Sequence, residues 1–213
     1  GTGAFRECVA LKKIVVSSGV ECIAEEMFYE CASLTEIVLP NTLKEIGVDA
    51  FYNCKALTSI DLPASVTAIG LGAFRWCALK KIVVPTGIER IESNMFNDCT
   101  SLTEVVLPSM LKEIRGMAFF GCIALENIEL PASVTAIGSI AFGGCSSLKK
   151  IVVPTGVERI EGSTFVGCSN LTEVVLPSTL KEIMGMAFRK CEALKTVVLP
   201  SSLEDIGKDA FYM

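Results

Sequence analysis

One phrase recurs along the whole sequence at a fixed spacing, and this repetition constrains the fold more than any other feature. Phenylalanine stands at positions 5, 28, 51, 74, 96, 119, 142, 165, 188 and 211, so the interval is 23 residues except for one of 22. Cysteine follows each of the first nine three residues later. The short interval arises in Cys77–Lys81, a connection one residue shorter than its counterpart Cys54–Ser59. Units this small cannot bury their hydrophobic residues alone, so stacked copies must share one core.

The unit reads L-x-x-I-x-L-P-x-x-L-x-x-I-x-x-x-A-F-x-x-C. Alternating β-branched residues before the proline predict a strand, and proline ends it because it lacks an N–H. The second alternation, as in "LKEI", predicts a shorter strand, and "AFxxC" suggests a short helical turn. Residues 1–213 are therefore expected to form a single repeat solenoid of about nine coils, with a parallel sheet roughly 40–45 Å long. The chain begins and ends within a repeat, which suggests a fragment of a longer array without caps; uncapped edges invite self-association.

Composition argues against several classes of function. The net charge is −5 with no block of like charge, so no nucleic-acid partner is indicated. No apolar run approaches the ~20 residues of a membrane span. Histidine is absent, and no phosphate-binding glycine motif occurs. We therefore expect no catalytic, cofactor-binding or metal-binding residues, and no enzymatic activity.

The repeated phrase resembles the 23-residue leucine-rich repeats of the BspA-like surface protein family. The resemblance covers essentially the whole chain. The chain departs from the family pattern at Ser17 in the proline position, at Met27 and Met95 before phenylalanine, and after Cys77, where one residue is missing. It implies a right-handed leucine-rich repeat superhelix with its parallel sheet on the concave face. It also implies a cell-surface or secreted location and adhesion to host matrix proteins or to other cells.

Stacking places equivalent residues in columns, and the charges in these columns follow a three-coil period. The residue before the centre of the first strand is basic, then acidic, then neutral, three times over: Lys13, Glu36, Ser59, Lys81, Glu104, Asn127, Lys150, Glu173 and Thr196. Identical copies ~5 Å apart would stack like charges, which is destabilising. The period reflects either duplication of a three-coil block or selection for lateral pairing, and the sequence leaves both open.

The columns in which the same apolar residue recurs from coil to coil are interpreted as core. The phenylalanines predict an internal ring stack, and nine cysteines in one column predict a buried thiol ladder, because in-register Cβ atoms lie too far apart for disulfides. Cys22 falls in a column of charged and small residues, so we expect an exposed thiol. Trp76, the only tryptophan, is interpreted as covering the surface beside the short connection.

A candidate binding face follows from the outward positions of the first strand. The column after the strand centre is valine in seven of nine coils. The candidate binding residues are Val38, Asp61, Val83, Val106, Glu129, Val152 and Val175, with Lys81, Glu104, Lys150 and Glu173 at their border. An apolar row on a solvent-exposed face is typical of a contact site. Valine also has a high strand propensity, which would explain the row without a partner. The sequence thus predicts a non-enzymatic module that binds a protein or glycan of unknown identity. The alternative is a passive spacer.

Overall fold

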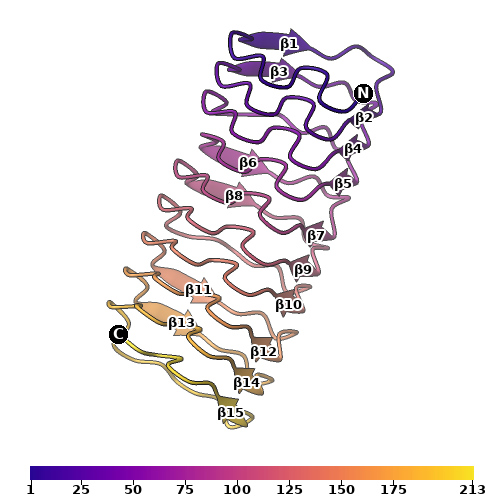
Figure 1. Ribbon diagram of the computed structural model, residues 1–213. Helices are drawn as coiled ribbons and strands as arrows, with labels where there is room; N and C mark the ends of the chain where they lie inside the picture. Colours follow the sequence, from indigo (N-terminus) through magenta and orange to yellow (C-terminus); the bar gives the residue numbers. More distant parts are fainter.

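The computed structural model describes residues 1–213 as a stack of similar coils with two rows of parallel strands (Figure 1). One row contains strands of three residues, here called first strands: β1 (Lys13–Val15), β3 (Glu36–Val38), β6 (Lys81–Val83), β8 (Glu104–Val106), β11 (Lys150–Val152) and β13 (Glu173–Val175). The other row contains second strands of two residues: β2 (Cys22–Ile23), β4 (Glu45–Ile46), β5 (Ala68–Ile69), β7 (Arg90–Ile91), β9 (Glu113–Ile114), β10 (Ala136–Ile137), β12 (Arg159–Ile160), β14 (Glu182–Ile183) and β15 (Asp205–Ile206).

The strand register confirms the columns read from the sequence. Every strand pair is parallel and in step with the repeat; in β6 and β8, Lys81 lies opposite Glu104 and Val83 opposite Val106. Each paired first strand exposes its two outer residues and buries its central residue, as the alternation predicts, except that Ile14 of the terminal strand β1 is only half-buried. A side chain therefore lies beside its own copies in the neighbouring coils.

The expected continuous sheet is divided into six small sheets, which corrects the sequence-based picture. First strands pair only as β1–β3, β6–β8 and β11–β13, whereas second strands form three trios. We call the openings in the first row seams: they separate residues 35–39 from 58–62, 103–107 from 126–130, and 172–176 from 195–199. No backbone hydrogen bond crosses a seam. The second row opens one junction later, between β5 and β7 and between β10 and β12. At these junctions the first row also has no strand pair and is joined only by single bonds, from the Lys80 N–H to the Thr58 carbonyl and from the Lys149 N–H to the Glu126 carbonyl.

The short helical turns expected around phenylalanine are absent as helix; each is a run of hydrogen-bonded turns. The reason lies in the backbone, because the residues two before and two after each internal phenylalanine have left-handed φ angles, as at Glu26 (53°) and Glu30 (56°). Left-handed residues interrupt a right-handed helix. Alternate N–H groups instead bond to the next coil, as from Phe28 to the Ala50 carbonyl at 2.8 Å. The turns thus add a third row of lateral hydrogen bonds.

The core is one continuous cluster of 55 buried residues that runs the length of the stack. The ten repeated phenylalanine rings form an unbroken column, with successive centroids 5.1 to 5.8 Å apart and nearly parallel planes. Such offset stacks add to the stabilisation from burial itself. The predicted ring stack is confirmed.

The cysteine column is confirmed as free thiols, and it has a structural role beyond filling space. Each buried thiol donates to the backbone carbonyl of the repeated phenylalanine in the preceding coil; for example, Cys122 Sγ lies 3.2 Å from the Phe96 oxygen. The same carbonyl accepts the Cys99 N–H, at 3.1 Å. Burial raises the pKa of Cys99 and Cys145 to about 12, so these thiols stay protonated.

Thiol labelling checks this arrangement. Because the thiolate is the reactive form, we expect iodoacetamide at pH 8 to modify exposed Cys22 quickly and half-buried Cys8 more slowly. The eight buried cysteines should react only after unfolding in guanidinium chloride. Mass spectrometry after timed quenching gives the count, and rapid native labelling of Cys99 or Cys145 would contradict a protected ladder.

Candidate interaction face

The exposed side of the first strands presents the valine column as a row of apolar side chains, here called the valine stripe. All of its valines are exposed, with exposed fractions from 41% to 84%: Val15, Val38, Val83, Val106, Val152, Val175 and Val198. Asp61 and Glu129 occupy the same column in two intervening coils and are also exposed. The structure therefore brings the stripe predicted from sequence to one face.

Ion pairs border the stripe on one side. Lys81 Nζ lies 2.6 Å from Glu104 Oε1, and the copies Lys13–Glu36 and Lys150–Glu173 have distances of 2.6 and 2.7 Å. About half of each side chain is exposed, so solvent screens these pairs and each contributes only ~0.2–1 kcal/mol. Their regular geometry fits lateral pairing between coils, and it also gives the face a fixed pattern of charge.

The third coil of each block differs, since its border residue is neutral and it follows a seam. At the seam between 103–107 and 126–130 the surface is hollowed, with a volume of about 570 Å³. An equivalent hollow of about 460 Å³ lies one 69-residue period later, between 172–176 and the coil of Val198. Glu129 lines the first hollow and Val198 the second. Glu129 and Asp61 form no ion pair, so they are available to a partner.

Sequence reasoning missed the seams and the residues beneath them. The hollow beside Glu129 is lined also by Thr103, Ser109 and Pro131, none of which belongs to the predicted set. The signal was present in the three-coil charge period, because each seam separates an acidic coil from a neutral one. From the sequence, that period is interpreted as block duplication or as lateral charge pairing, and the structure shows that it also marks where the first-strand ladder opens.

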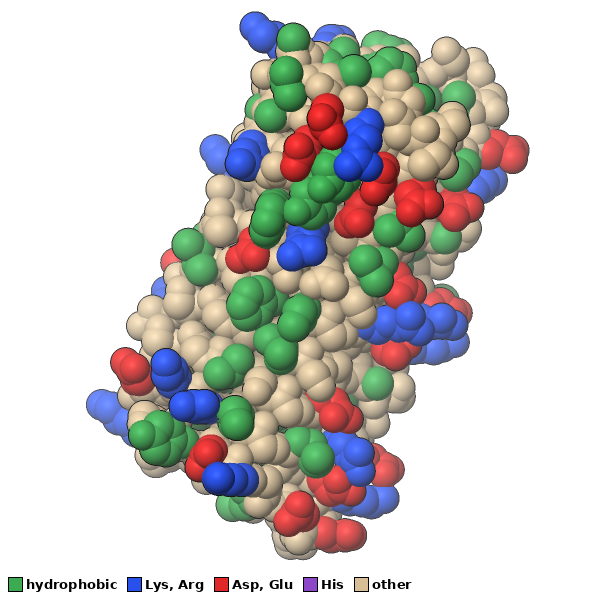
Figure 2. All heavy atoms as spheres, viewed as in Figure 1, with side chains coloured by type: hydrophobic (Ala, Val, Ile, Leu, Met, Phe, Trp, Pro, Cys, Tyr) green, Lys and Arg blue, Asp and Glu red, His purple; other side chains and the backbone are tan.

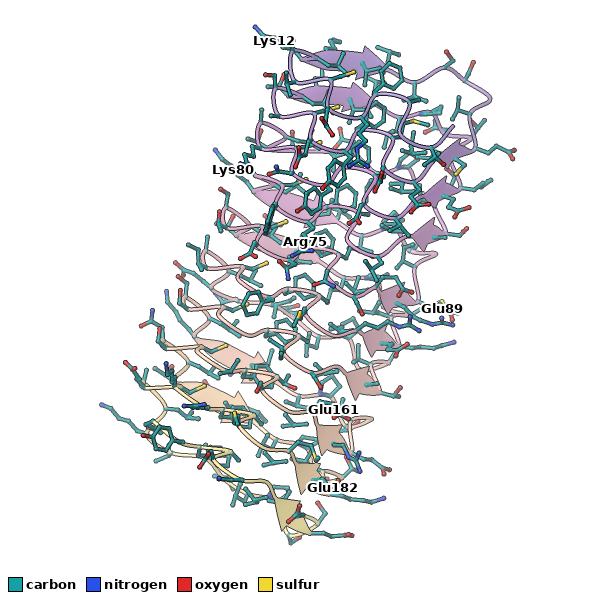
Figure 3. The ribbon with its side chains drawn as sticks, viewed as in Figure 1. Lys12, Arg75, Lys80, Glu89, Glu161 and Glu182 are labelled. Atoms are coloured by element: carbon teal, nitrogen blue, oxygen red, sulfur yellow. The ribbon has the colours of Figure 1, made fainter.

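The row of second strands is a contrasting, strongly charged edge. Lys181 Nζ lies 2.7 Å from Glu158 Oε2. The hydrogen bond that Arg159 donates to the Glu182 carboxylate raises the pKa of Arg159. Glu89, Glu161 and Glu182 lie along this edge in Figure 3, away from Lys12 and Lys80 at the opposite edge. Apolar contact is thus offered mainly by the first-strand face.

No group of three or more histidine, cysteine, aspartate or glutamate side chains is arranged to hold a metal ion. The structure also contains no helix with the length and hydrophobicity needed to cross a membrane.

Stacked 23-residue coils with a parallel first-strand ladder define a leucine-rich repeat protein. A family model described as a BspA-type leucine-rich repeat region matches residues 1–102 and 89–213, in six copies, so the chain belongs to this family. Leucine-rich repeat proteins of this kind are generally protein-interaction or surface proteins without catalytic activity. A comparison with curated proteins finds no match.

Solved structures support the same classification. A leucine-rich repeat protein from Bacteroides ovatus is 29% identical with a TM-score of 0.59, and the match covers 100% of this chain and 79% of that one. A leucine-rich cell surface protein from Faecalibacterium prausnitzii is 30% identical with a TM-score of 0.61, covering 96% of this chain and 62% of the other. A leucine-rich repeat protein from Eubacterium ventriosum, 22% identical with a TM-score of 0.56, shares the fold.

Proposed function

We propose that this chain is the recognition segment of a cell-surface protein, and that it binds a protein partner through the first-strand face. The observation that carries the proposal is the valine stripe, which is exposed in every valine-bearing coil and bordered by polar pairs. An apolar strip with a polar rim is the usual composition of a protein interface. The cell-surface description of the Faecalibacterium relative supports the location, and adhesion is the role that we propose for the binding.

Asp61 and Glu129 would set the register of the partner along the stripe. They lie three coils apart, a separation of ~14 Å at the usual strand spacing. An extended partner segment with apolar side chains against Val83 and Val106 could place a cation beside each carboxylate. Charge pairs of this kind contribute specificity more than affinity.

A spacer is the second candidate function, favoured by the continuous phenylalanine column. A stack bonded laterally on three sides is stiff, and it could hold another domain away from a surface without binding anything itself. In that case the exposed valines only stabilise the strands through their strand propensity.

The two functions separate in a binding experiment with Val106→Lys/Val152→Lys. The wild-type chain should bind at least one immobilised purified extracellular-matrix protein, and the variant should bind at least ~100-fold more weakly, because two charged side chains in an apolar contact each cost more than 1.4 kcal/mol. Surface plasmon resonance measures both. Circular dichroism and thermal melting should show that the variant keeps the fold.

The matched control is Met110→Lys/Ile123→Lys, which adds the same charge at exposed apolar positions outside the stripe. This control should bind like the wild type. Equal loss in both variants would mean that net charge, rather than the stripe, governs binding. Absence of binding by the wild-type chain to every matrix protein in the panel would favour the spacer.

A further inference from the structure

The strongest departure from the repeat lies at Trp76 and the short connection that follows it. In a regular coil the connection closes with two backbone hydrogen bonds, such as Lys55 N–H to the Asn53 carbonyl at 2.9 Å and Leu57 N–H to the Cys54 carbonyl at 3.0 Å. In the short connection the N–H groups of Ala78 and Leu79 form no hydrogen bond. The deletion therefore removes the second of these bonds, at Leu79 beside the only tryptophan; the first is missing also after Cys99, Cys168 and Cys191, where no residue is deleted.

Trp76 itself has an unfavourable backbone conformation. Its φ angle is 63°, in the left-handed region, and three later coils fill the same position with Gly121, Gly144 and Gly167. Asn53 and Asp98 occupy the same position in the adjacent coils with φ angles of 58° and 54°, so the conformation belongs to the repeat, and tryptophan is its bulkiest occupant. The side chain remains 39% exposed.

Neighbouring side chains hold the indole in a fixed position. Tyr29 and Tyr52 stack with ring centroids 4.4 Å apart, and the Trp76 ring continues the row 5.2 Å from Tyr52. The Arg75 guanidinium lies 5.1 Å from the centre of the Trp76 ring. On the other side, Trp76 Nε1 donates to Asp98 Oδ2 at 3.0 Å.

This row lies on the broad face between the two rows of strands, where Figure 3 labels Arg75. Figure 2 shows hydrophobic side chains among charged ones on the upper part of the same face. No other stretch of the solenoid has such a row, because the later copies of these positions include only two aromatic residues, Phe120 and Tyr212, which lie four coils apart. The constellation is singular in a molecule in which nearly everything else is repeated.

A pocket of about 410 Å³ adjoins the indole, within the ~300–1,000 Å³ of small-molecule sites. It is lined by Asn53, Lys55, Trp76, Cys77, Ala78, Asp98 and Thr100. Its polar groups include both kinds of hydrogen-bonding partner: the Asp98 carboxylate accepts, the Lys55 ammonium donates, and the Thr100 hydroxyl does both. Asn53 Oδ1 beside it has no hydrogen-bond partner, which adds unused polar capacity.

We propose that this pocket binds a neutral pyranose ring, such as a terminal sugar of a glycan. A pyranose offers a C–H face that packs on an indole and closely spaced hydroxyls that donate and accept at once. The pocket suits neither single charge, because Asp98 opposes an anion while Lys55 opposes a cation. The covering role predicted for Trp76 from the sequence does not account for the hydrogen bond from its Nε1 to Asp98 or for the pocket beside it.

The only tryptophan in the chain reports directly on this pocket. Intrinsic fluorescence should be titrated with methyl glycosides and short oligosaccharides of glucose, galactose, mannose and N-acetylglucosamine. We expect a saturable change with at least one of them. Asp98→Asn should weaken that binding at least ~tenfold, because it removes a charge-assisted hydrogen bond while keeping an acceptor for the indole.

Trp76→Asn should abolish the binding measured by isothermal titration calorimetry, and it should keep the fold because Asn53 already occupies the equivalent position with a φ of 58°. The matched control is Lys190→Asn, at the same position of a distant coil, which should bind the sugar normally. Val106→Lys/Val152→Lys should also bind it normally, so failure of the first-strand proposal leaves this one intact. No saturable response to any sugar, undiminished binding by Trp76→Asn, or preference for a charged peptide would overturn the proposal.

Discussion

Phe119→Ala is expected to destabilise the protein by ~3–5 kcal/mol, the usual cost of removing a fully buried phenylalanine ring. The ring is completely buried at the middle of the column, and its centroid lies 5.3 Å from those of Phe96 and Phe142. Its loss leaves a cavity and removes two ring contacts at once. Because each coil contacts only its neighbours, the variant should also couple its two halves less tightly. Urea unfolding followed by circular dichroism should show a lower midpoint and a broader or two-step transition.

Phe120→Ala is the control for this prediction. Phe120 follows directly in the sequence but is only half-buried and lies outside the column. Its removal should cost clearly less and leave one sharp transition. If the two variants were equally destabilised, the ring column would have no special role in joining the coils.

Alkaline pH should produce a comparably large effect through the thiol ladder. Burial raises the pKa of Cys31 to about 11 and that of Cys99, Cys145 and Cys191 to about 12, and raises it well above the ordinary 9.0 for Cys77, Cys122 and Cys168. Below pH 9 the thiols are protonated in both folded and unfolded chains. Above it the unfolded chain loses protons that the folded chain retains, so the free energy of unfolding falls as pH rises toward about 12. At pH 10 the loss is ~1.4 kcal/mol per thiol.

Urea unfolding between pH 7 and 10, in the presence of a reductant, tests this prediction. Stability should change little up to about pH 8.5 and then fall steeply. The double variant Cys122→Ala/Cys145→Ala should show a shallower fall, reduced by ~1.4 kcal/mol per pH unit for each thiol removed. An identical slope in wild type and variant would assign the alkaline loss to other groups.

The columns were predictable from sequence because a strict period leaves the side-chain register no freedom. Once Lys81 and Glu104 are 23 residues apart in stacked coils, their pairing at 2.6 Å follows from the spacing alone. The phenylalanine stack and the exposed valines follow in the same way. What spacing cannot give is the backbone conformation within a coil, and the left-handed residues around each phenylalanine carry no consistent residue type, from Glu30 to Ile140. The expected helical turns were wrong for this reason.

The candidate sites also differ in how far residue spacing predicts them. The valine stripe is a property of one column, so it could be read directly. The seams were not predicted, although each lies between an acidic and a neutral coil of the three-coil charge period. The column two residues after each phenylalanine contains Asn53, Trp76 and Asp98, but spacing alone does not show that these side chains border a pocket.

The staggered openings in the two strand rows have a mechanical consequence. A surface-attached stack pulled along its long axis bears the load on the bonds between coils rather than along the chain. Junctions such as β6–β8 are bonded on both rows, whereas the junction after β8 lacks the first-row bonds. The junction between residues 58–62 and 80–84 has no strand pair in either row and keeps only the bond from the Lys80 N–H to the Thr58 carbonyl on the first row. Extension should therefore concentrate at junctions of this kind, while the doubly bonded pairs of coils stay rigid. The array would respond to tension as stiff blocks linked by compliant joints.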